Sequence, residues 1–343
     1  MSLHALSPEL FKSLIVGAIS LEDKSSGFTP VRLDVADRAF INEGLWSSAH
    51  RPSGVRVRCK TNATSFRLEL TMESNTEPMW DGDNVVDVFI DEELKASFNC
   101  KGTDQTPTRF AVALGDLADG EKILDIYFPA TTRVLLHHLS LNEGAFAEAA
   151  PARSRWLTHG SSITNGAQAA SGGFTWPAIV ARKKNWDLLN LGYGGQCKME
   201  QVVARLIART PADRISLCLG INTAGGEYSQ RVWASTAEGF IMTVRDGHPE
   251  TPLLIISPIL SPPREKVADE GDLMKSLTTM REALKASVDK FRAAGDANIH
   301  YFDGRNIIGP GDEDYMPDEL HPDADGIKLM GARFLEHAPS VWG

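Results

Sequence analysis

The sequence is poor in the features that mark several common classes of protein. Its 343 residues include only four cysteines, and none of them forms a CxxC pair, which argues against a zinc cluster. A disulfide between Cys59 and Cys100 stays open, and Cys218 is expected to be a small core residue. No run approaches the roughly 20 apolar residues that a membrane-spanning helix needs, so we expect no contact with a membrane.

Basic residues are outnumbered as well. The 35 Lys and Arg residues stand against 45 Asp and Glu, which gives a formal net charge of −10. Because non-specific binding to nucleic acid needs a basic face, we expect no nucleic-acid partner. Residues 1–20 lack the basic start and the small-residue cleavage site of a secretory signal, which predicts a cytoplasmic location. Nothing in the composition indicates an oligomeric state.

The first half of the chain has the pattern of short β-strands. Apolar and polar residues alternate over 55–60 and again over 66–71, on either side of a turn at 61–64, and this predicts a hairpin with one buried face. Residues 1–20 are expected to form a short helix leading in. Further strands are expected at 85–90, 95–99, 109–114, 122–128 and 134–141. Many short strands without a long helix predict an antiparallel β-sandwich, for which a jelly roll is the preferred topology.

Two sets of residues outside any motif are candidates for substrate contact. Four aromatic side chains of the first half either face a ligand or, as we favour, belong to its core and rim: Trp46, Trp80, His137 and His138. A long irregular loop is expected at 258–275, and such a loop after a strand is often a lid or a pocket wall. Arg264 in this loop either reaches a substrate or is solvated.

After residue 155 strands alternate with helices. Strands are expected at 155–157, 187–191, 214–219, 252–257 and 299–302, and helices at 174–184, 199–209, 232–245, 273–293 and 325–338. This alternation predicts an α/β fold in which helices cover both faces of a parallel sheet. The predicted organisation is therefore a β-sandwich domain at 1–144, a linker at 145–154 and an α/β domain at 155–343.

The stretch Arg155–Gly166, RWLTHGSSITNG, reads as a strand, a tight turn and the start of a helix. Ser and Thr cap helix starts, where unpaired N–H groups and partial positive charge can stabilise an oxyanion beside a serine hydroxyl. His159 is expected to pack under the turn rather than act as a base. Taken alone, the stretch fits an ordinary capped helix equally well.

Three later stretches favour catalysis: Asn190–Gly195, Gly220–Asn222 and Asp318–His321. A hydroxyl nucleophile needs a base, and the base needs an orienting carboxylate. Ser162, His321 and Asp318 supply these three types, while Gly195 and Asn222 offer a backbone N–H and a side-chain amide. Because each stretch follows or precedes an element at the carboxyl edge of a parallel sheet, we expect all of them to converge.

The four blocks, in this chain order, resemble those of the SGNH (GDSL-type) hydrolase superfamily. Two positions differ from its common pattern: Ser161 stands where the family usually has Asp, and Thr223 follows the Asn in place of Asp. The first block resembles a Gly-Ser-Ser-Ile-Thr subgroup. The resemblance implies that Ser162 is the nucleophile, with an oxyanion hole built from the Ser162 N–H, the Gly195 N–H and the Asn222 amide. It implies no metal and no organic cofactor.

Two-domain members of this superfamily with an N-terminal β-sandwich are carbohydrate esterases. The resemblance therefore implies a serine esterase that removes a short acyl group, most simply acetyl, from a sugar or similar alcohol. An acyltransferase that uses the same acyl-enzyme stays open, as does a lactonase. A carbohydrate-binding protein with an inactive hydrolase domain is less favoured, because Ser162, Asp318 and His321 are all retained. The expected partner is a small-molecule or saccharide ester.

Overall fold

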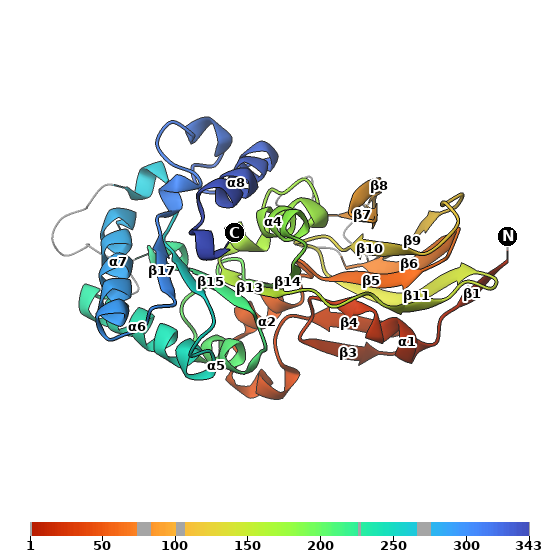
Figure 1. The fold of residues 1–343 in the computed structure, drawn as a ribbon, viewed down its shortest axis with the longest axis horizontal. Helices are drawn as coiled ribbons and strands as arrows, with labels where there is room; N and C mark the ends of the chain where they lie inside the picture. Colours follow the sequence, from red (N-terminus) through yellow and green to blue (C-terminus); the bar gives the residue numbers. More distant parts are fainter. Residues whose placement is uncertain (1, 74–83, 101–106, 226–227, 266–275, 343) are drawn as a thin grey trace.

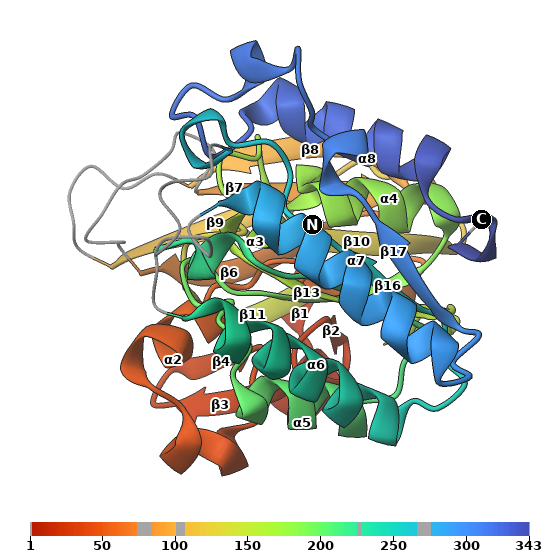
Figure 2. The ribbon, with the colours of Figure 1, turned by 90° about the vertical axis from the view of Figure 1, so that its left-hand side faces the viewer.

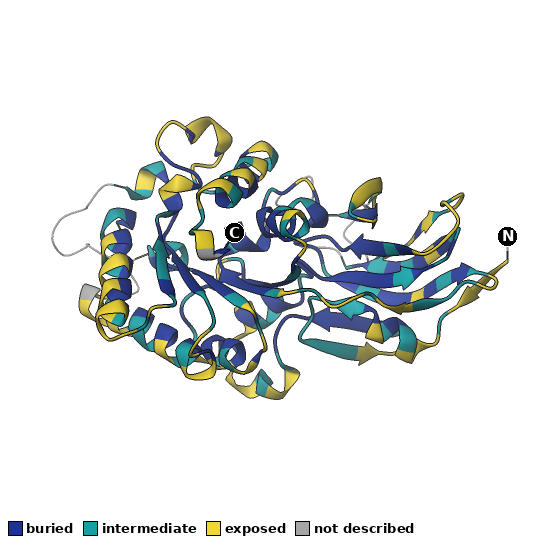
Figure 3. Cartoon of the chain, viewed as in Figure 1, coloured by how far each residue is buried: buried dark blue, intermediate teal, exposed yellow. Residues whose placement is uncertain are grey.

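The computed structural model describes residues 2–73, 84–100, 107–225, 228–265 and 276–342. Two antiparallel sheets form one part of the molecule, and a parallel sheet flanked by helices forms the other (Figure 1). The strands of the parallel sheet and the central strands of the two antiparallel sheets are largely buried, while exposed residues gather on outer helices, loops and the outlying strands (Figure 3). None of the described helices is long and apolar enough to cross a membrane.

The first half is a β-sandwich built around one apolar core between its two sheets. One sheet contains β1 (Leu3–Ala5), β3 (Ser20–Lys24), β4 (Gly27–Val31), β6 (Phe66–Met72), β9 (Thr108–Leu114) and β11 (Val134–Asn142). The other contains β2 (Ile15–Val16), β5 (Arg56–Thr61), β7 (Val85–Ile90), β8 (Glu93–Asn99), β10 (Lys122–Tyr127) and β12 (Ala147–Ala149). Their central orders, β4-β11-β6-β9 and β5-β10-β7-β8, are those of a jelly roll, which confirms the preferred topology.

Three local predictions for this half were wrong in part. Strands β5 and β6 do not form a hairpin, because β5 pairs with β10 and β6 pairs with β11 in the opposite sheet. The alternation correctly predicted that each strand has one buried face. The buried faces of both strands pack in the same core. Alternation does not specify which strand pairs with which, so the hairpin could not be tested from the pattern alone. The N-terminal helix is limited to α1 (Pro8–Ser13). Part of the predicted linker is strand β12, which pairs with β5.

The second half is a five-stranded parallel sheet between two layers of helices. Its strands, in the order β14-β13-β15-β16-β17, are β14 (Asp187–Gly192), β13 (Arg155–Gly160), β15 (Arg214–Cys218), β16 (Leu253–Ile256) and β17 (Ile299–Phe302). The helices are α3 (Ser162–Asn165), α4 (Trp176–Lys184), α5 (Gln201–Arg209), α6 (Gln230–Gly247), α7 (Leu277–Ala293) and α8 (Ala324–His337). The predicted α/β fold, preceded by an antiparallel β domain, is confirmed.

Alternating residues of the parallel strands enter different cores, because successive side chains point to opposite faces of a sheet. Leu157 and Ile255 pack with residues of α5, α6 and α7, whereas Trp156 and Leu254 pack with residues of α4 and α8. In Figure 2, α5 and α6 lie below the sheet and α4 and α8 lie above it. Both faces are thus covered, which explains the nearly continuous apolar strands.

An early segment of the chain packs on the parallel sheet rather than between the sandwich sheets. Helix α2 (Glu43–Ala49) and the residues before it contribute Leu33, Ile41 and Leu45 to the core shared with α5 and α6. The sequence analysis assigned this segment to the sandwich, because its short apolar run carries no sign of the sheet against which it packs. The two halves are therefore joined by a shared core as well as by the chain.

A buried arginine reinforces this junction. Arg32 is fully buried and donates only to neutral oxygen atoms among the described residues: the carbonyls of Ser48, Arg51, Asn190 and Gly192 and the side-chain oxygen of Asn165. Burial is the main cause that lowers the pKa of Arg32, to about 10, and the nearby Arg51 contributes. The side chain still carries its charge at neutral pH, and it links the first half to α3 and to the end of β14.

We expect Arg32→Met to lower the free energy of unfolding by about 3–5 kcal/mol, because several buried oxygen atoms lose their donors at once. The matched control is Arg209→Met, which removes a half-exposed arginine paired with Asp34 and Asp37 and should cost no more than about 1 kcal/mol. Urea unfolding followed by tryptophan fluorescence measures both values. Equal losses for the two variants would contradict the importance given to the buried contacts.

Candidate active site

Two glycines, Gly160 and Gly166, determine the shape of the turn that carries Ser162. Strand β13 ends at Gly160, where a Cβ atom would lie 2.2 Å from Thr164 Oγ1 and 2.8 Å from Thr164 Cβ, so a larger residue would displace Thr164 from α3. Ser161 caps α3, since its Oγ accepts from the N–H of Ile163 at 3.3 Å. Ser162 is the first residue of α3, and Gly166, with φ of 101°, ends the helix after one turn. Ser162 is thereby held at the carboxyl edge of the sheet.

Ser162, His321 and Asp318 form one continuous series of hydrogen bonds. The Ser162 Oγ lies 2.8 Å from His321 Nε2, and His321 Nδ1 lies 2.7 Å from Asp318 Oδ2. His321 is buried, whereas the Asp318 side chain is 42% exposed. The geometry is that of a nucleophile, a base and an orienting carboxylate. The structure brings together the three residues that were predicted to work together.

The Asp318 carboxylate is held by the backbone of its own turn. Its Oδ1 accepts from the N–H groups of Leu320 and His321 at 3.0 and 2.7 Å. Partial burial by itself would raise the pKa of Asp318, but these hydrogen bonds and the one to the His321 ring outweigh it and lower the pKa. The group is therefore charged at neutral pH, as an orienting carboxylate must be.

The glycine block after β14 lies against Ser162, the candidate nucleophile. A Cβ atom on Gly194 would lie 3.7 Å from Ser162 Cβ, and one on Gly192 would lie 2.4 Å from the backbone nitrogen of Asn165. Gly195 has φ of 69°, and a Cβ atom there would meet no other atom within 4 Å. Glycine is therefore favoured at this position by the left-handed backbone conformation and not by a lack of space. This conformation places the loop after β14 beside α3.

Asn222 lies in the short 3-10 helix Ile221–Thr223 that follows β15. Its side-chain oxygen accepts from the backbone N–H of Cys197 at 3.0 Å. Because a backbone N–H can only donate, the atom that it contacts is the amide oxygen of Asn222. The Nδ2 group of the same amide, on the side away from Cys197, is therefore available as a donor. Strands β13 and β15 are neighbours at the point where the strand order reverses, which is the usual ligand site of such sheets.

A small apolar cavity adjoins these residues. Its volume is about 30 Å³, and its lining includes the neighbours in sequence of Ser162, Asn222 and His321, namely Ile163, Ile221 and Leu320. Among the described residues, no three His, Cys, Asp or Glu side chains gather closely enough to hold a metal ion.

Residues 154–334 match the model of the GDSL-like Lipase/Acylhydrolase family. The chain belongs to this family. Residues 14–137 match a second model, that of the SsfX3 N-terminal domain. The prediction of an SGNH (GDSL-type) serine hydrolase is confirmed, and acyl-ester chemistry, by hydrolysis or by acyl transfer, follows from it. No protein of curated function matches the chain significantly.

Solved structures resemble this GDSL-like hydrolase over nearly its whole length. Salicylyl-acyltransferase SsfX3 from a tetracycline biosynthetic pathway is 27% identical, with a TM-score of 0.84, and the match covers 93% of this chain and 92% of SsfX3. A candidate GDSL-like lipase from Bacteroides ovatus is 21% identical, with a TM-score of 0.78 and coverages of 99% and 97%. A family two carbohydrate esterase from Clostridium thermocellum, solved with cellohexaose, is 16% identical, with a TM-score of 0.63 and coverages of 83% and 91%.

The remaining histidines, tryptophans and cysteines named in the sequence analysis of this GDSL-like chain are accounted for by their packing, hydrogen bonds or exposure, where the structure describes them. His159 is fully buried under the turn, as expected. His137 is buried between Ser26 O and Thr71 Oγ1, and Trp46 is partly buried with its ring edge-on to His50. His138 is exposed, and Trp80 lies outside the described residues. All four cysteines are free, so Cys59 and Cys100 form no disulfide.

The predicted loop at 258–275 is described only as far as residue 265. Arg264 donates to Ser261 Oγ at 2.9 Å, and Ser261 Oγ donates to the carbonyl of Glu319 at 2.8 Å. The described part of this loop therefore supports the turn that carries Asp318 and His321.

Sequence analysis missed two residues of the site in this hydrolase. Arg51 of the first half lies beside the glycine block, with its Nη1 3.4 Å from the position that a Cβ on Gly194 would take. Gln168 donates from Nε2 to Asp318 Oδ2 at 3.4 Å. Neither belongs to a motif, and no local pattern could have indicated either contact, since Arg51 lies far from the glycine block in sequence and Gln168 far from Asp318.

Proposed function

We propose that this chain is a serine esterase that hydrolyses a short acyl ester, most simply an acetyl ester, of a sugar or similar alcohol through an acyl-enzyme on Ser162. The observation that carries the proposal is the hydrogen-bonded series from Asp318 through His321 to Ser162. The fold shared with a carbohydrate esterase supports a saccharide alcohol.

In the first step Ser162 Oγ attacks the ester carbonyl while its proton passes to His321 Nε2. The oxyanion that forms is stabilised by the N–H groups of Ser162 and Gly195 and by Asn222 Nδ2, and each such donor is worth roughly 3–4 kcal/mol in related chemistry. The tetrahedral species then collapses, and the alcohol leaves with the proton from His321. Asp318 keeps the proton of the neutral ring on Nδ1 and stabilises the imidazolium.

In the second step water attacks the acyl carbonyl on Ser162. His321 takes a proton from this water and returns it to Ser162 Oγ as the acid is released. Ser162 is thus regenerated, and one ester is converted to one acid and one alcohol.

A panel of esters tests the proposal. Wild-type protein and Ser162→Ala are compared on p-nitrophenyl acetate, butyrate and octanoate, on acetylated sugars and on a lactone. The expected result is a kcat/KM that is highest for the acetyl esters and absent in Ser162→Ala. Preference for the lactone or the octanoate would overturn the substrate class. Saccharide binding without any ester turnover would identify an inactive hydrolase domain.

An acyltransferase is the second candidate, because the similarity to salicylyl-acyltransferase SsfX3 extends over both halves of the chain. The same acyl-enzyme would then be resolved by an alcohol instead of water. The measurement is the ratio of acid to new ester when increasing concentrations of an alcohol or sugar acceptor are added. A product that is mainly ester at millimolar acceptor would favour the transferase.

A further inference from the structure

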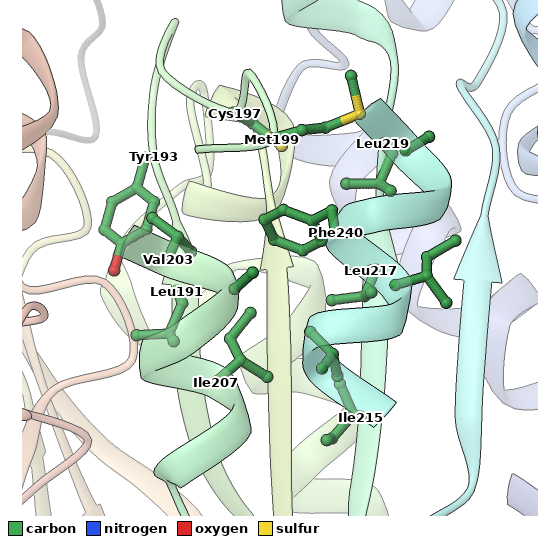
Figure 4. Close-up of a cluster of buried hydrophobic side chains, with 14 of the residues drawn as sticks. Leu191, Tyr193, Cys197, Met199, Val203, Ile207, Ile215, Leu217, Leu219 and Phe240 are labelled. Carbon is green, nitrogen blue, oxygen red and sulfur yellow. The ribbon is translucent and has the colours of Figure 1, made fainter. Parts of the chain in front are cut away.

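The mechanism leaves one buried pair unused, namely His159 and Cys197 beneath the candidate oxyanion hole. His159 Nε2 lies 3.4 Å from Cys197 Sγ, and both side chains are almost completely buried. Figure 4 shows Cys197 near the top of the buried cluster, above Phe240. The His159 ring stacks on Phe240 with a centroid distance of 5.5 Å, which fixes its plane.

The hydrogen bonds assign a role to each atom of the pair. His159 Nδ1 lies 2.7 Å from the carbonyl oxygen of Leu191, which can only accept, so Nδ1 carries the proton and Nε2 has a free electron pair. Burial lowers the pKa of His159 to about 4 and raises the pKa of the Cys197 thiol well above its usual value. The thiol therefore stays protonated, and its proton has two acceptors within reach, His159 Nε2 at 3.4 Å and the carbonyl oxygen of Cys218 at 3.6 Å.

The same cysteine is in direct contact with the oxyanion-hole candidate. Its backbone N–H donates to Asn222 Oδ1 at 3.0 Å. The loop around Cys197 is not held by regular structure, because Gly195 and Met199 both have positive φ, of 69° and 62°. Hydrogen bonds hold the backbone on either side, from Gln196 N to Tyr193 O and from Lys198 N to Glu200 Oε2. The Cys197 side chain adds a buried anchor at the residue that contacts Asn222.

We infer that His159 and Cys197 are positioning residues that orient the Asn222 amide toward the oxyanion. The inference rests on the proposed function of Asn222. The Cys197 thiol contacts the His159 ring, and that ring is held by its hydrogen bond to the carbonyl oxygen of Leu191 in β14. The backbone N–H of residue 197 then holds Asn222 Oδ1, so that Nδ2 faces the reacting carbonyl. Loss of the anchor loosens a donor that contributes to the transition state more than to substrate binding.

A double-mutant cycle tests this inference with p-nitrophenyl acetate. We expect Cys197→Ala to lower kcat about tenfold with KM changed less than twofold, and Asn222→Ala to lower kcat by on the order of 10²–10³. The double variant should equal Asn222→Ala, because the anchor then has nothing to orient. A trifluoromethyl ketone, which forms an oxyanion on Ser162, should bind about tenfold more weakly to Cys197→Ala.

Further variants separate orientation from packing. Cys197→Ser keeps a donor and should restore kcat to within about threefold of wild type, whereas Cys197→Val fills the space without donating and should behave like Cys197→Ala. Cys59→Ala is the matched control, since Cys59 is equally buried in the jelly-roll core, and it should leave kcat unchanged.

The outcomes distinguish this inference from the proposed function. Full additivity of Cys197→Ala and Asn222→Ala, or an equal loss for Cys197→Ser and Cys197→Ala, would overturn the inference alone. Unchanged activity in Asn222→Ala would overturn the oxyanion-hole assignment and the inference with it. Unchanged activity in Ser162→Ala would overturn the proposed function itself.

Discussion

Ser162→Ala is expected to lower kcat/KM for an acetyl ester by on the order of 10⁴-fold or more, because it removes the hydroxyl that forms the acyl-enzyme in the proposed mechanism. The Ser162 Oγ is the atom that His321 Nε2 contacts, at 2.8 Å. Steady-state kinetics measures the loss. A fluorophosphonate probe followed by peptide mass spectrometry should place the adduct on Ser162 in wild-type protein and detect none in the variant.

The neighbouring serine is the matched control for this prediction. The Ser161 side chain accepts from the N–H of Ile163 and caps α3, so Ser161→Ala should cost about 1 kcal/mol of stability while activity stays within about tenfold of wild type. Recovery of the probe on Ser161, or loss of activity in Ser161→Ala that matches Ser162→Ala, would show that the two serines have been assigned in the wrong order.

His321→Ala is expected to lower kcat/KM by on the order of 10⁴-fold, and Asp318→Asn by only about 10- to 100-fold. His321 moves the proton, whereas Asp318 acts through the orientation and charge of the ring. The Asp318 side chain is 42% exposed, so water can take over part of its role. Gln168 also contacts its carboxylate and remains in the variant.

Both variants are compared on the same acetyl ester at a pH where a histidine is neutral. Circular dichroism and the thermal midpoint serve as the control for folding, because Asp318 also accepts from the backbone of its own turn. Losses of equal size, or a larger loss for Asp318→Asn, would mean that the carboxylate does more than orient the base.

Local patterns were sufficient to predict the parallel sheet and the four blocks at its edge. Each of these strands and helices carries its own period of apolar residues. The first three blocks lie at or directly after the ends of strands, and the block Asp318–His321 directly precedes α8. That Ser162 and His321 meet then follows from the rule that ligand sites of such folds lie at the carboxyl edge of the sheet. The hydrogen-bonded series of the active-site candidates was therefore predictable before any contact was seen.

Contacts between distant segments could not be predicted in this way. The pairing of β5 with β10, rather than with β6, depends on which strands meet across the jelly roll, and alternation is the same in either arrangement. The Cys197 thiol and the His159 ring are joined by no sequence motif. Arg32 looked like any surface arginine, because its partners Asn190 and Gly192 lie more than 150 residues away.

The contacts of Arg32 have a consequence for how such a chain can evolve. Its guanidinium supplies donors to Asn190, Gly192 and Asn165, all of which belong to the α/β half. A recombination event that transferred this half without the jelly roll would separate α3 and the glycine block from the guanidinium that links them, and would expose the apolar surface on which Leu33, Ile41 and Leu45 pack. We therefore expect the two halves to be retained together, since neither keeps its part of the shared core when it is separated from the other.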